Sequence, residues 1–311
     1  MDGILNVYKE AGYTSHDVVA KLRGILGQKK IGHTGTLDPA ATGVLPVCCG
    51  KATKICELLT NKDKTYQAVC RLGVITDTQD TTGKILEERT VKNITVEEIY
   101  QAVASFEGEI MQTPPMYSAL KVNGKKLCDL ARAGVTVERQ ARPVQLYSIE
   151  IIKMELPRVC MRVRCSKGTY IRTLCQDIGE KLSCGACMES LLRTKVSEFC
   201  VQDALRLSEI EERVQKAAGQ TPSEQWNAEM FDFIYAVDSV FLQYKKAVIC
   251  KEWNKLLYNG NRMKKDMFVS YQKDWEQQKV RIYDEEGRFI GIYEYSEIHG
   301  DYKPVKLFME A

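Results

Sequence analysis

The chain has 311 residues, of which 44% are hydrophobic and 27% charged, and its formal net charge is +3. This composition is ordinary for a globular protein, and the length suits two domains or one large domain with an appendage. No run of 18 or more apolar residues is present, which excludes a membrane-spanning helix. The start shows no secretory signal, so the twelve cysteines are expected to be reduced thiols of a cytoplasmic protein.

The charges are unevenly distributed along the chain. Residues 121–172 contain twelve Lys or Arg and four Asp or Glu, whereas residues 201–238 contain eight acids and three bases. A basic middle and an acidic later segment are typical of a protein with one face for a polyanion. An unevenly charged solvated surface explains the same counts, and charge alone does not separate the two.

The first third of the chain alternates helix and strand patterns. The first helix is expected over residues 14–27, where Thr14 or Ser15 can cap the start and Gly27 the end. A buried strand is expected in "VLPVCCG" and a short helix in "KATKICELL". Residues 65–72 alternate as a strand, with Tyr66, Ala68, Cys70 and Leu72 on one face, and "TDTQDTTGK" has turn chemistry.

The middle of the chain contains two further helix patterns and one long excursion. Thr95 and Glu98 match a capping box for a helix that ends near Phe106. Residues 113–134 carry a proline pair and several basic residues, which predicts a long loop with a short helix outside the core. Residues 171–182 have a helical pattern.

The remaining segments predict a strand, a linker and a small β-rich unit. Residues 158–165 alternate between a mostly basic and an apolar face, as a strand does. Residues 214–226 are polar and are interpreted as an irregular linker. After about residue 240, "NG" at 259–260 and "DEEG" at 284–287 separate short alternating runs, which is typical of a small β domain.

The stretch "GHTGTLDPAATGVLP", residues 32–46, carries a single formal charge, on Asp38. Pro39 fixes its own φ and disfavours the α region for Asp38, so the carboxylate is presented from a stiff, extended point. A lone aspartate held in this way suits a nucleophile or a general base. It also suits a structural turn in which the carboxylate bonds to its own backbone, and local chemistry leaves both open.

Several long motifs resemble, in order, those of the TruB family of tRNA pseudouridine synthases. The catalytic signature resembles "GHTGTLDPAATGVLPVCCGKATK", residues 32–54. The second motif, the RNA-gripping insertion and the third motif resemble residues 64–85, 113–134 and 163–182. Residues 280–295 are similar to part of the C-terminal RNA-binding domain of PUA type, so the resemblance covers nearly the whole chain.

The resemblance implies an α+β fold whose mixed, mainly antiparallel sheet is flanked by helices. It implies a catalytic domain over 1–238, an insertion at about 113–145 and a small PUA-type β-barrel over 239–311. The implied activity converts uridine to pseudouridine at position 55 in the T-loop of tRNA, with the tRNA T-arm and elbow as partner. It implies a cytoplasmic monomer that needs no metal and no nucleotide or other cofactor.

The same resemblance assigns residue roles. Asp38 is the essential carboxylate, either the nucleophile or the base that abstracts a ribose proton. Arg172 pairs with it, and Tyr66 stacks on the flipped uracil. Further residues are expected to hold the substrate, namely His33, Gly35, Thr36, Leu37, Lys167, Tyr170 and Arg193. For Tyr66 a purely structural role is the alternative, and for Lys167 a solvated surface position.

Two departures and two rival functions accompany this interpretation. Cys187 and Leu192 stand where the family often has His and Arg, which predicts a weaker or altered RNA contact. The CxxC at 184–187 has no second ligand pair, so a metal site is not expected. The rivals are an RNA-binding protein without catalysis and a glycosidic-bond hydrolase, although hydrolases commonly use two carboxylates and only one is in a motif here.

Overall fold

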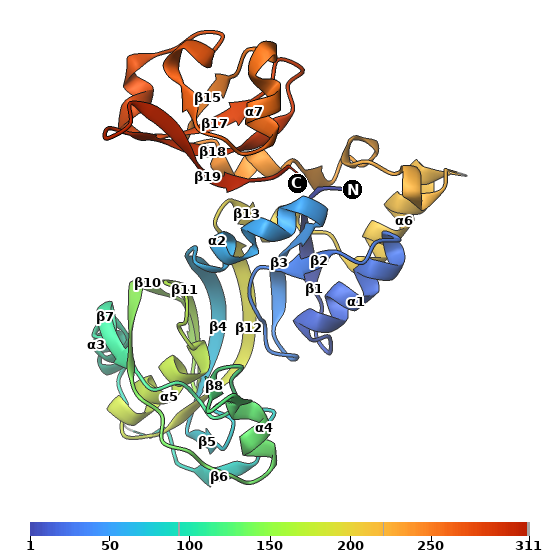
Figure 1. Ribbon diagram of the computed structural model, residues 1–311. Helices are drawn as coiled ribbons and strands as arrows, with labels where there is room; N and C mark the ends of the chain where they lie inside the picture. The colour runs from blue at the N-terminus through green and yellow to red at the C-terminus, as the bar shows by residue number, and fades with distance from the viewer. Residues whose placement is uncertain (93, 220, 310–311) are drawn as a thin grey trace.

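The computed structural model describes residues 1–92, 94–219 and 221–309, and its largest feature is a long twisted sheet (Figure 1). Ten strands of the described chain belong to this sheet. Its pairs are antiparallel except β3 with β12, which confirms the mixed, mainly antiparallel expectation. In spatial order its main path contains β14 (Ile234–Tyr235), β1 (Gly3–Lys9), β3 (Thr42–Cys49), β12 (Ala186–Val196), β4 (Lys64–Leu72), β11 (Arg158–Cys165), β10 (Arg142–Glu155) and β7 (Gly108–Gln112), with β13 (Phe199–Cys200) beside β12 and β2 (Ile31–His33) beside β3.

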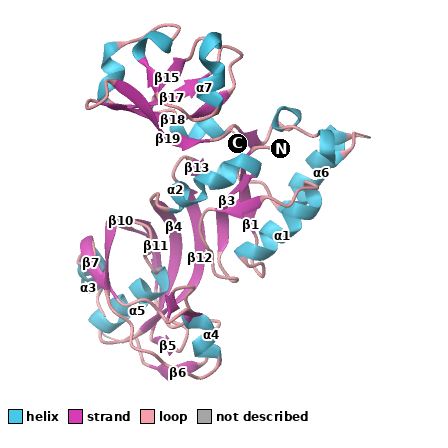
Figure 2. Cartoon of the chain, viewed as in Figure 1, coloured by secondary structure: helices cyan, strands magenta, loops and turns pink. Residues whose placement is uncertain are grey.

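Helices pack on this sheet at both ends (Figure 2). One apolar cluster joins β1 and β3 to α1 (Ser15–Ile25) and α6 (Leu207–Ala218). A second joins β4, β10, β11 and β12 to α3 (Val96–Ala104) and α5 (Ile171–Lys181). Helices thus cover the sheet at its two ends, each through its own apolar cluster.

Local sequence signals explain where several elements begin. Thr14, one of the two predicted caps, caps α1 and forms a capping box with Asp17, and Thr95 caps α3 through the predicted box with Glu98. Helix α3 ends at Ala104, two residues before the predicted end. Strand β4 buries the predicted alternate positions, Tyr66, Ala68, Cys70 and Leu72.

The predicted linker at 214–226 is wrong in its first part, because α6 continues to Ala218. The helix is amphipathic: Leu207, Ile210, Val214 and Ala218 are all buried. These side chains recur at helical spacing and form an apolar stripe that packs toward α1. In the sequence, the polar residues between them make this stripe hard to recognise.

The predicted excursion at 113–134 is confirmed as a loop with little regular structure. It contains a two-strand hairpin, β8 (Lys121–Val122) and β9 (Lys125–Lys126), and one short helix, α4 (Leu127–Arg132). Strand β10 then returns the chain to the sheet at Arg142. A separate hairpin, β5 (Val74–Thr76) with β6 (Ile85–Glu88), holds the predicted turn at 76–84.

The last part of the chain forms a curled five-stranded sheet, as the β-rich pattern predicts. Its strands are β15 (Lys245–Val248), β17 (Lys279–Tyr283), β18 (Phe289–Ser296), β19 (Asp301–Leu307) and β16 (Met263–Lys264), with α7 (Asn254–Tyr258) beside them. This C-terminal unit has its own apolar core, in which Tyr293 is fully buried.

A shared apolar cluster joins the C-terminal unit to the large sheet. Phe241 and Phe308 pack with Ile55 and Leu59, which belong to the 3-10 turn Gly50–Ile55 and to α2 (Cys56–Thr60). Lys54 Nζ also donates to the Leu307 carbonyl at 3.0 Å. Among the helices of the described residues, none has the length and apolar character needed to span a bilayer.

Candidate active site

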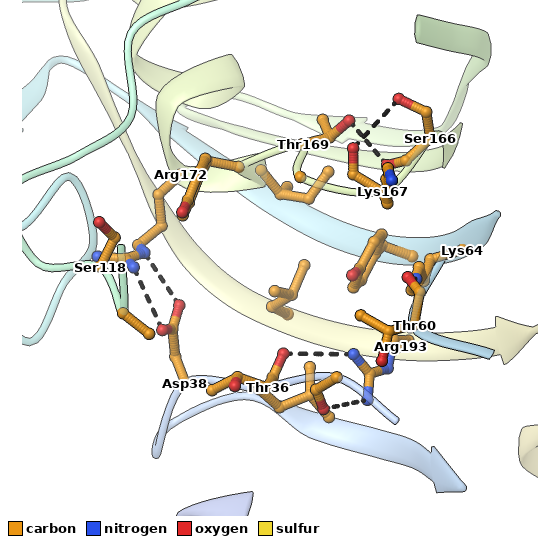
Figure 3. Close-up of a pocket in the computed structure, with 18 of the residues that line it drawn as sticks. Thr36, Asp38, Thr60, Lys64, Ser118, Ser166, Lys167, Thr169, Arg172 and Arg193 are labelled. Atoms are coloured by element: carbon orange, nitrogen blue, oxygen red, sulfur yellow. Dashed lines mark hydrogen bonds and ion pairs between the residues drawn. The ribbon is translucent and has the colours of Figure 1, made fainter. Parts of the chain in front are cut away.

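A cavity of about 450 Å³ lies between the loop after β2, the start of α5 and the insertion (Figure 3). Every predicted site residue except His33 lines it. The structure therefore brings together residues that are more than 150 positions apart in sequence, which are Gly35, Thr36, Leu37, Asp38, Tyr66, Lys167, Tyr170, Arg172 and Arg193.

Asp38 and Arg172 form a two-point ion pair inside the cavity. Arg172 Nε lies 3.0 Å from Asp38 Oδ2, and Arg172 Nη2 donates to Oδ1 at 3.2 Å. The arginine side chain is 6% exposed and the aspartate side chain 35%. Within the described residues the hydrogen bonds of this carboxylate go to Arg172 rather than to its own loop amides, so the structural-turn alternative does not explain Asp38.

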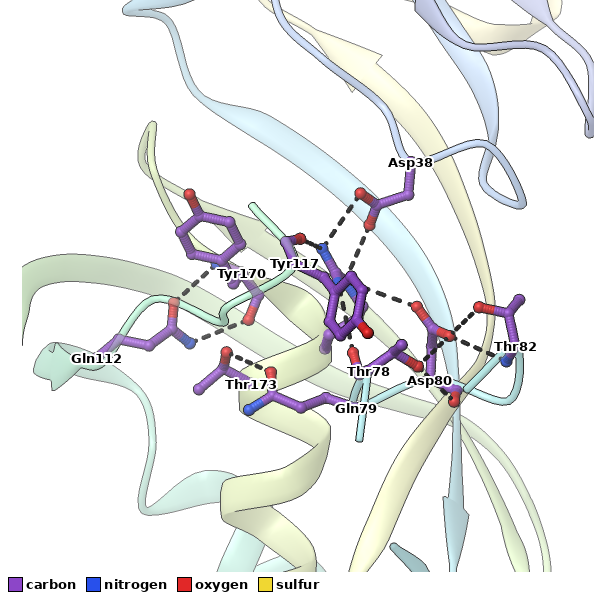
Figure 4. A network of polar contacts seen from close by, with 10 residues as sticks. Asp38, Thr78, Gln79, Asp80, Thr82, Gln112, Tyr117, Tyr170 and Thr173 are labelled. Atoms are coloured by element: carbon purple, nitrogen blue, oxygen red, sulfur yellow. Dashed lines mark hydrogen bonds and ion pairs between the residues drawn. The ribbon is translucent and has the colours of Figure 1, made fainter. Parts of the chain in front are cut away.

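Arg172 is itself held by three further groups (Figure 4). Its Nη1 donates to the Thr78 carbonyl at 3.1 Å and its Nη2 to the Tyr117 carbonyl at 2.8 Å. Its Nε also lies 3.8 Å from the Asp80 carboxylate. These contacts leave the guanidinium little freedom to leave Asp38.

Asp80 was missed by sequence reasoning, which assigned its segment only to a turn. The residue does organise the turn, because its carboxylate accepts from Thr78 Oγ1, Thr82 N and Thr82 Oγ1. It also places a second negative charge beside Arg172. The only available signal was the density of aspartates in "TDTQD", which turn chemistry explains equally well.

The pKa of Asp38 is raised above its usual range because burial in the cavity disfavours the charged form. The Arg172 guanidinium opposes this rise, and the Asp80 carboxylate adds to it. Because the Asp38 side chain keeps 35% exposure, water in the open cavity limits the penalty. We therefore expect an ionised Asp38 near neutral pH.

Buried polar groups hold the Asp38 loop from below. Ser15 Oγ accepts from the Leu37 amide at 3.0 Å, and Lys9 Nζ donates to the Pro39 carbonyl at 3.1 Å. Both Ser15 and Lys9 are fully buried, and burial lowers the pKa of Lys9 to about 8. Neither residue stands out in the sequence, because the contacts depend on how β1 and α1 meet the loop.

Arg193 supports the other end of the same loop. Its guanidinium donates to the carbonyls of Val44, Thr36 and Gly35 at 2.7, 3.3 and 3.4 Å, and the residue is 1% exposed. Gly43 makes this packing possible, because its φ is +107° and an added Cβ would lie 2.2 Å from the Arg193 carbonyl oxygen. The structure therefore gives Arg193 a role in shaping the loop, and its contact with substrate stays a prediction.

Tyr66 in β4 is the direct cross-strand partner of Arg193 in the neighbouring strand β12. It is 9% exposed and lines the cavity. Burial raises the pKa of its hydroxyl, which keeps the phenol protonated.

Two lysines lie at the end of the cavity away from Asp38 (Figure 3). Lys167 Nζ donates to Asn61 Oδ1 at 2.9 Å. Lys64 Nζ donates to the carbonyls of Thr60 and Lys62 at 2.5 and 2.6 Å, and burial lowers its pKa to about 8. The cavity thus has the carboxylate at one end and cations with hydroxyl groups at the other.

Family models match the chain across this whole site. Residues 23–171 match the TruB family pseudouridylate synthase N-terminal domain, and residues 172–242 match the tRNA pseudouridylate synthase B C-terminal domain. The tRNA pseudouridine synthase B of Lachnoclostridium phytofermentans is 52% identical over 99% of this chain and 100% of the relative. The chain belongs to the TruB family. The tRNA pseudouridine synthase B of Clostridium novyi is 46% identical over 94% of this chain and 95% of its own length.

Solved structures agree with the family. A chain of the Cbf5-Nop10-Gar1 complex is similar with a TM-score of 0.71 and 25% identity, covering 99% of this chain and 85% of that one. A chain of the archaeal box H/ACA sRNP Nop10-Cbf5 complex has a TM-score of 0.69 at 24% identity and supports the fold alone. The expected pseudouridine synthase fold is confirmed.

His33, which the TruB resemblance assigns to substrate holding, lies beside the cavity rather than in its lining. Its ring packs edge-on against His16 with centroids 5.1 Å apart, and its Nδ1 accepts from the Gly35 amide at 3.3 Å. Burial lowers its pKa, which favours the neutral ring. This geometry suits positioning of the loop or of RNA.

The departures from the TruB pattern lie away from the cavity lining. Cys187 is fully buried in β12, and Leu192 is half-buried, whereas their neighbours Leu191 and Arg193 line the cavity. The altered RNA contact therefore stays a prediction. Burial raises the pKa of both thiols of the CxxC, to about 11 at Cys187, and among the described residues no group of three or more potential ligands could hold a metal. All twelve cysteines are free thiols.

Proposed function

We propose that the protein converts uridine to pseudouridine at position 55 in the T-loop of tRNA. The observation that carries this is the ion pair of Asp38 with Arg172 in one cavity with the buried Tyr66. The relatives named tRNA pseudouridine synthase B, at up to 52% identity over nearly full length, support the substrate class. A binding protein without catalysis is not favoured, because RNA binding alone requires no carboxylate paired with an arginine inside the cavity.

Asp38 is the reacting carboxylate in this proposal. Arg172 aims both of its oxygens and offsets the cost of burying the charge. The reaction breaks the bond from ribose C1′ to uracil N1, the base turns, and C5 bonds to C1′. C5 then loses its proton to water, and N1 gains a proton, so that atoms balance. Asp38 serves either as the nucleophile or as the base that removes a ribose proton, and the two routes share the same geometry.

Tyr66 and the cavity shape hold the base between cleavage and rejoining. The buried phenol face offers a stacking surface, and the 450 Å³ cavity is large enough for one nucleotide. Once a nucleotide fills the cavity, the apolar walls of Leu37 and Leu191 limit water near C1′. Limited water suits isomerisation over hydrolysis.

The target uridine has to leave its stack, which costs a few kcal/mol. Lys64 and Lys167 at the far end of the cavity suit a phosphate, and the basic segment 121–172 adds further cations. In this proposal the insertion contacts the T-arm, residues 239–311 form a PUA-type RNA-binding domain, and the protein acts as a cytoplasmic monomer without a cofactor.

A tRNA transcript with tritium at uridine C5 tests the proposal. Wild-type protein should release tritium to water while the RNA chain and all bases are retained. Asp38→Asn keeps the side-chain shape but loses the charge, and the release rate should fall by at least about 1,000-fold. Asp203→Asn, an exposed acid remote from the cavity, is the matched control and should act as wild type.

Two outcomes would overturn the proposal. Abasic sites in the product would point to a hydrolase. Salt-sensitive tRNA binding by wild type without any tritium release would point to a binding protein or to another RNA substrate.

A further inference from the structure

Gln112, the last residue of β7, makes a two-point contact with the main chain of Tyr170 (Figure 4). The Tyr170 amide donates to Gln112 Oε1 at 2.7 Å, and Gln112 Nε2 donates to the Tyr170 carbonyl at 3.0 Å. Gln112 is 2% exposed and lies outside the cavity lining. A primary amide is the side chain that can donate and accept in this side-by-side arrangement.

The contact supplies one half of a capping box, because Gln112 accepts from the backbone amide of the N-cap residue, as the N3 side chain does in that motif. Tyr170 is the N-cap residue of α5, and that end has no side-chain cap. The Tyr170 carbonyl also accepts from the Leu174 amide at 3.1 Å, which is the first hydrogen bond of the helix. Gln112 thus satisfies the open amide of the N-cap and fixes the carbonyl on which the first turn is built.

Arg172 is the second residue of that first turn. A shift of Tyr170 therefore moves the guanidinium that aims Asp38. The same arginine donates to the Tyr117 carbonyl in the insertion, which begins directly after Gln112. Gln112 and Tyr117 accordingly connect the stem of the insertion to the N-terminal end of α5 at two points.

We propose that Gln112 is a positioning residue for uridine isomerisation, which sets the place of Arg172 and so the aim of Asp38 through its two hydrogen bonds to Tyr170. This rests on the proposed function, and Gln112 itself does not touch the substrate. Substitution of Gln112 should therefore change the rate of the chemical step rather than the affinity for RNA.

Gln112→Glu provides the central test. At neutral pH the ionised carboxylate repels the Tyr170 carbonyl, whereas the protonated acid can donate and accept as the amide does. Single-turnover tritium release should be slower than wild type by about 100-fold at high pH. The ratio of variant to wild-type rate should recover toward one as the pH falls, with tRNA affinity within about threefold throughout, since Gln112 lies outside the cavity lining.

Two further variants separate the loss of the hydrogen bonds from the effect of the added charge. Gln112→Met retains the length of the side chain without a charge or hydrogen bonds, and should lower the rate by about tenfold or more at every pH, without recovery. Gln145→Glu adds the same charge on the adjacent strand β10 at a half-buried position, and should act as wild type. Thermal unfolding of each variant identifies losses caused by misfolding.

The outcomes separate this inference from the proposed function. No tritium release by wild type defeats the function itself. If wild type is active and Gln112→Met releases tritium at the wild-type rate, the positioning role is wrong. It is also wrong if the loss of rate in Gln112→Glu stays constant or grows as the pH falls. A growing defect would mean that the added charge acts on the ionisation of Asp38.

Discussion

At the scale of single residues, the site depends on charged side chains whose positions are fixed by a few contacts. Both carboxylate oxygens of Asp38 contact one partner, Arg172, and that partner is fixed by the carbonyls of Thr78 and Tyr117. Arg193 is almost fully buried, and its donors serve loop carbonyls. These cations stabilise a loop shape as much as they counter a negative charge.

The pH dependence of the reaction follows from the environment of Asp38. Because burial raises its pKa, the ionised form is lost at a higher pH than for a free aspartate, so the rate should fall as the pH drops through that raised value. Arg172→Lys weakens the opposing interaction. Its acid limb should move to higher pH, and the single-turnover rate at neutral pH should fall by about 100-fold.

The measurement is the single-turnover rate as a function of pH. Arg213→Lys, an exposed arginine in α6, is the matched control and should retain the wild-type profile. An acid limb that stays in place or moves to lower pH in Arg172→Lys would contradict the assignment of Asp38.

At the scale of elements, α5 carries a candidate catalytic group in its first turn and a half-buried carboxyl further along. Its first turn carries Arg172, whereas Asp177 is half-buried later in the helix. Burial, with a smaller contribution from Glu180, raises the pKa of Asp177 to about 6. The folded state therefore resists ionisation of this carboxyl.

Replacing Asp177 should stabilise the protein in a pH-dependent way. The folded pKa is above the unfolded value of 3.8, so protonated Asp177 is tolerated at low pH, and stability is lost as the pH rises through about 6. Asp177→Asn should raise the free energy of unfolding by about 1 kcal/mol near pH 8, after allowing for partial solvent screening, and by little near pH 4. Denaturant titration at both values measures this, and an equal gain at both would refute the explanation.

At the scale of the whole molecule, the two sheets share an apolar cluster. Phe241 is 2% exposed and packs near Tyr244, Phe289 and Phe308. The same cluster contains Ile4 and Ile55 from the large sheet and the segment beside it. We expect this contact to couple the C-terminal unit to the rest of the chain.

Phe241→Ala tests that coupling. Loss of a buried phenylalanine typically costs about 3–5 kcal/mol. Calorimetry should show one unfolding transition for wild type, and for the variant a separate earlier transition of the C-terminal unit. Leu242→Ala, a change at a 68% exposed neighbour, is the control. A single transition that shifts as a whole would mean that the two parts remain one cooperative unit.

The sequence by itself determined many of the local elements and predicted the candidate reacting groups. A cap at Thr14 or Ser15 predicted the start of α1, and a capping box predicted the start of α3. Alternation predicted β4 and β11, and the motifs named Asp38, Tyr66 and Arg172 as candidates. These signals are local, because capping, periodicity and a long motif are written in contiguous residues.

Only the tertiary structure decided how the reacting groups are held. Lys9, Ser15, Asp80 and Gln112 act through contacts with residues that lie 22 to 92 positions away in sequence. Their residue types are common, and their meaning depends on which backbone groups the sheet and helices bring to them. A hydrogen bond between distant segments leaves no mark in either segment, so the support of the site could be found only once the chain was folded.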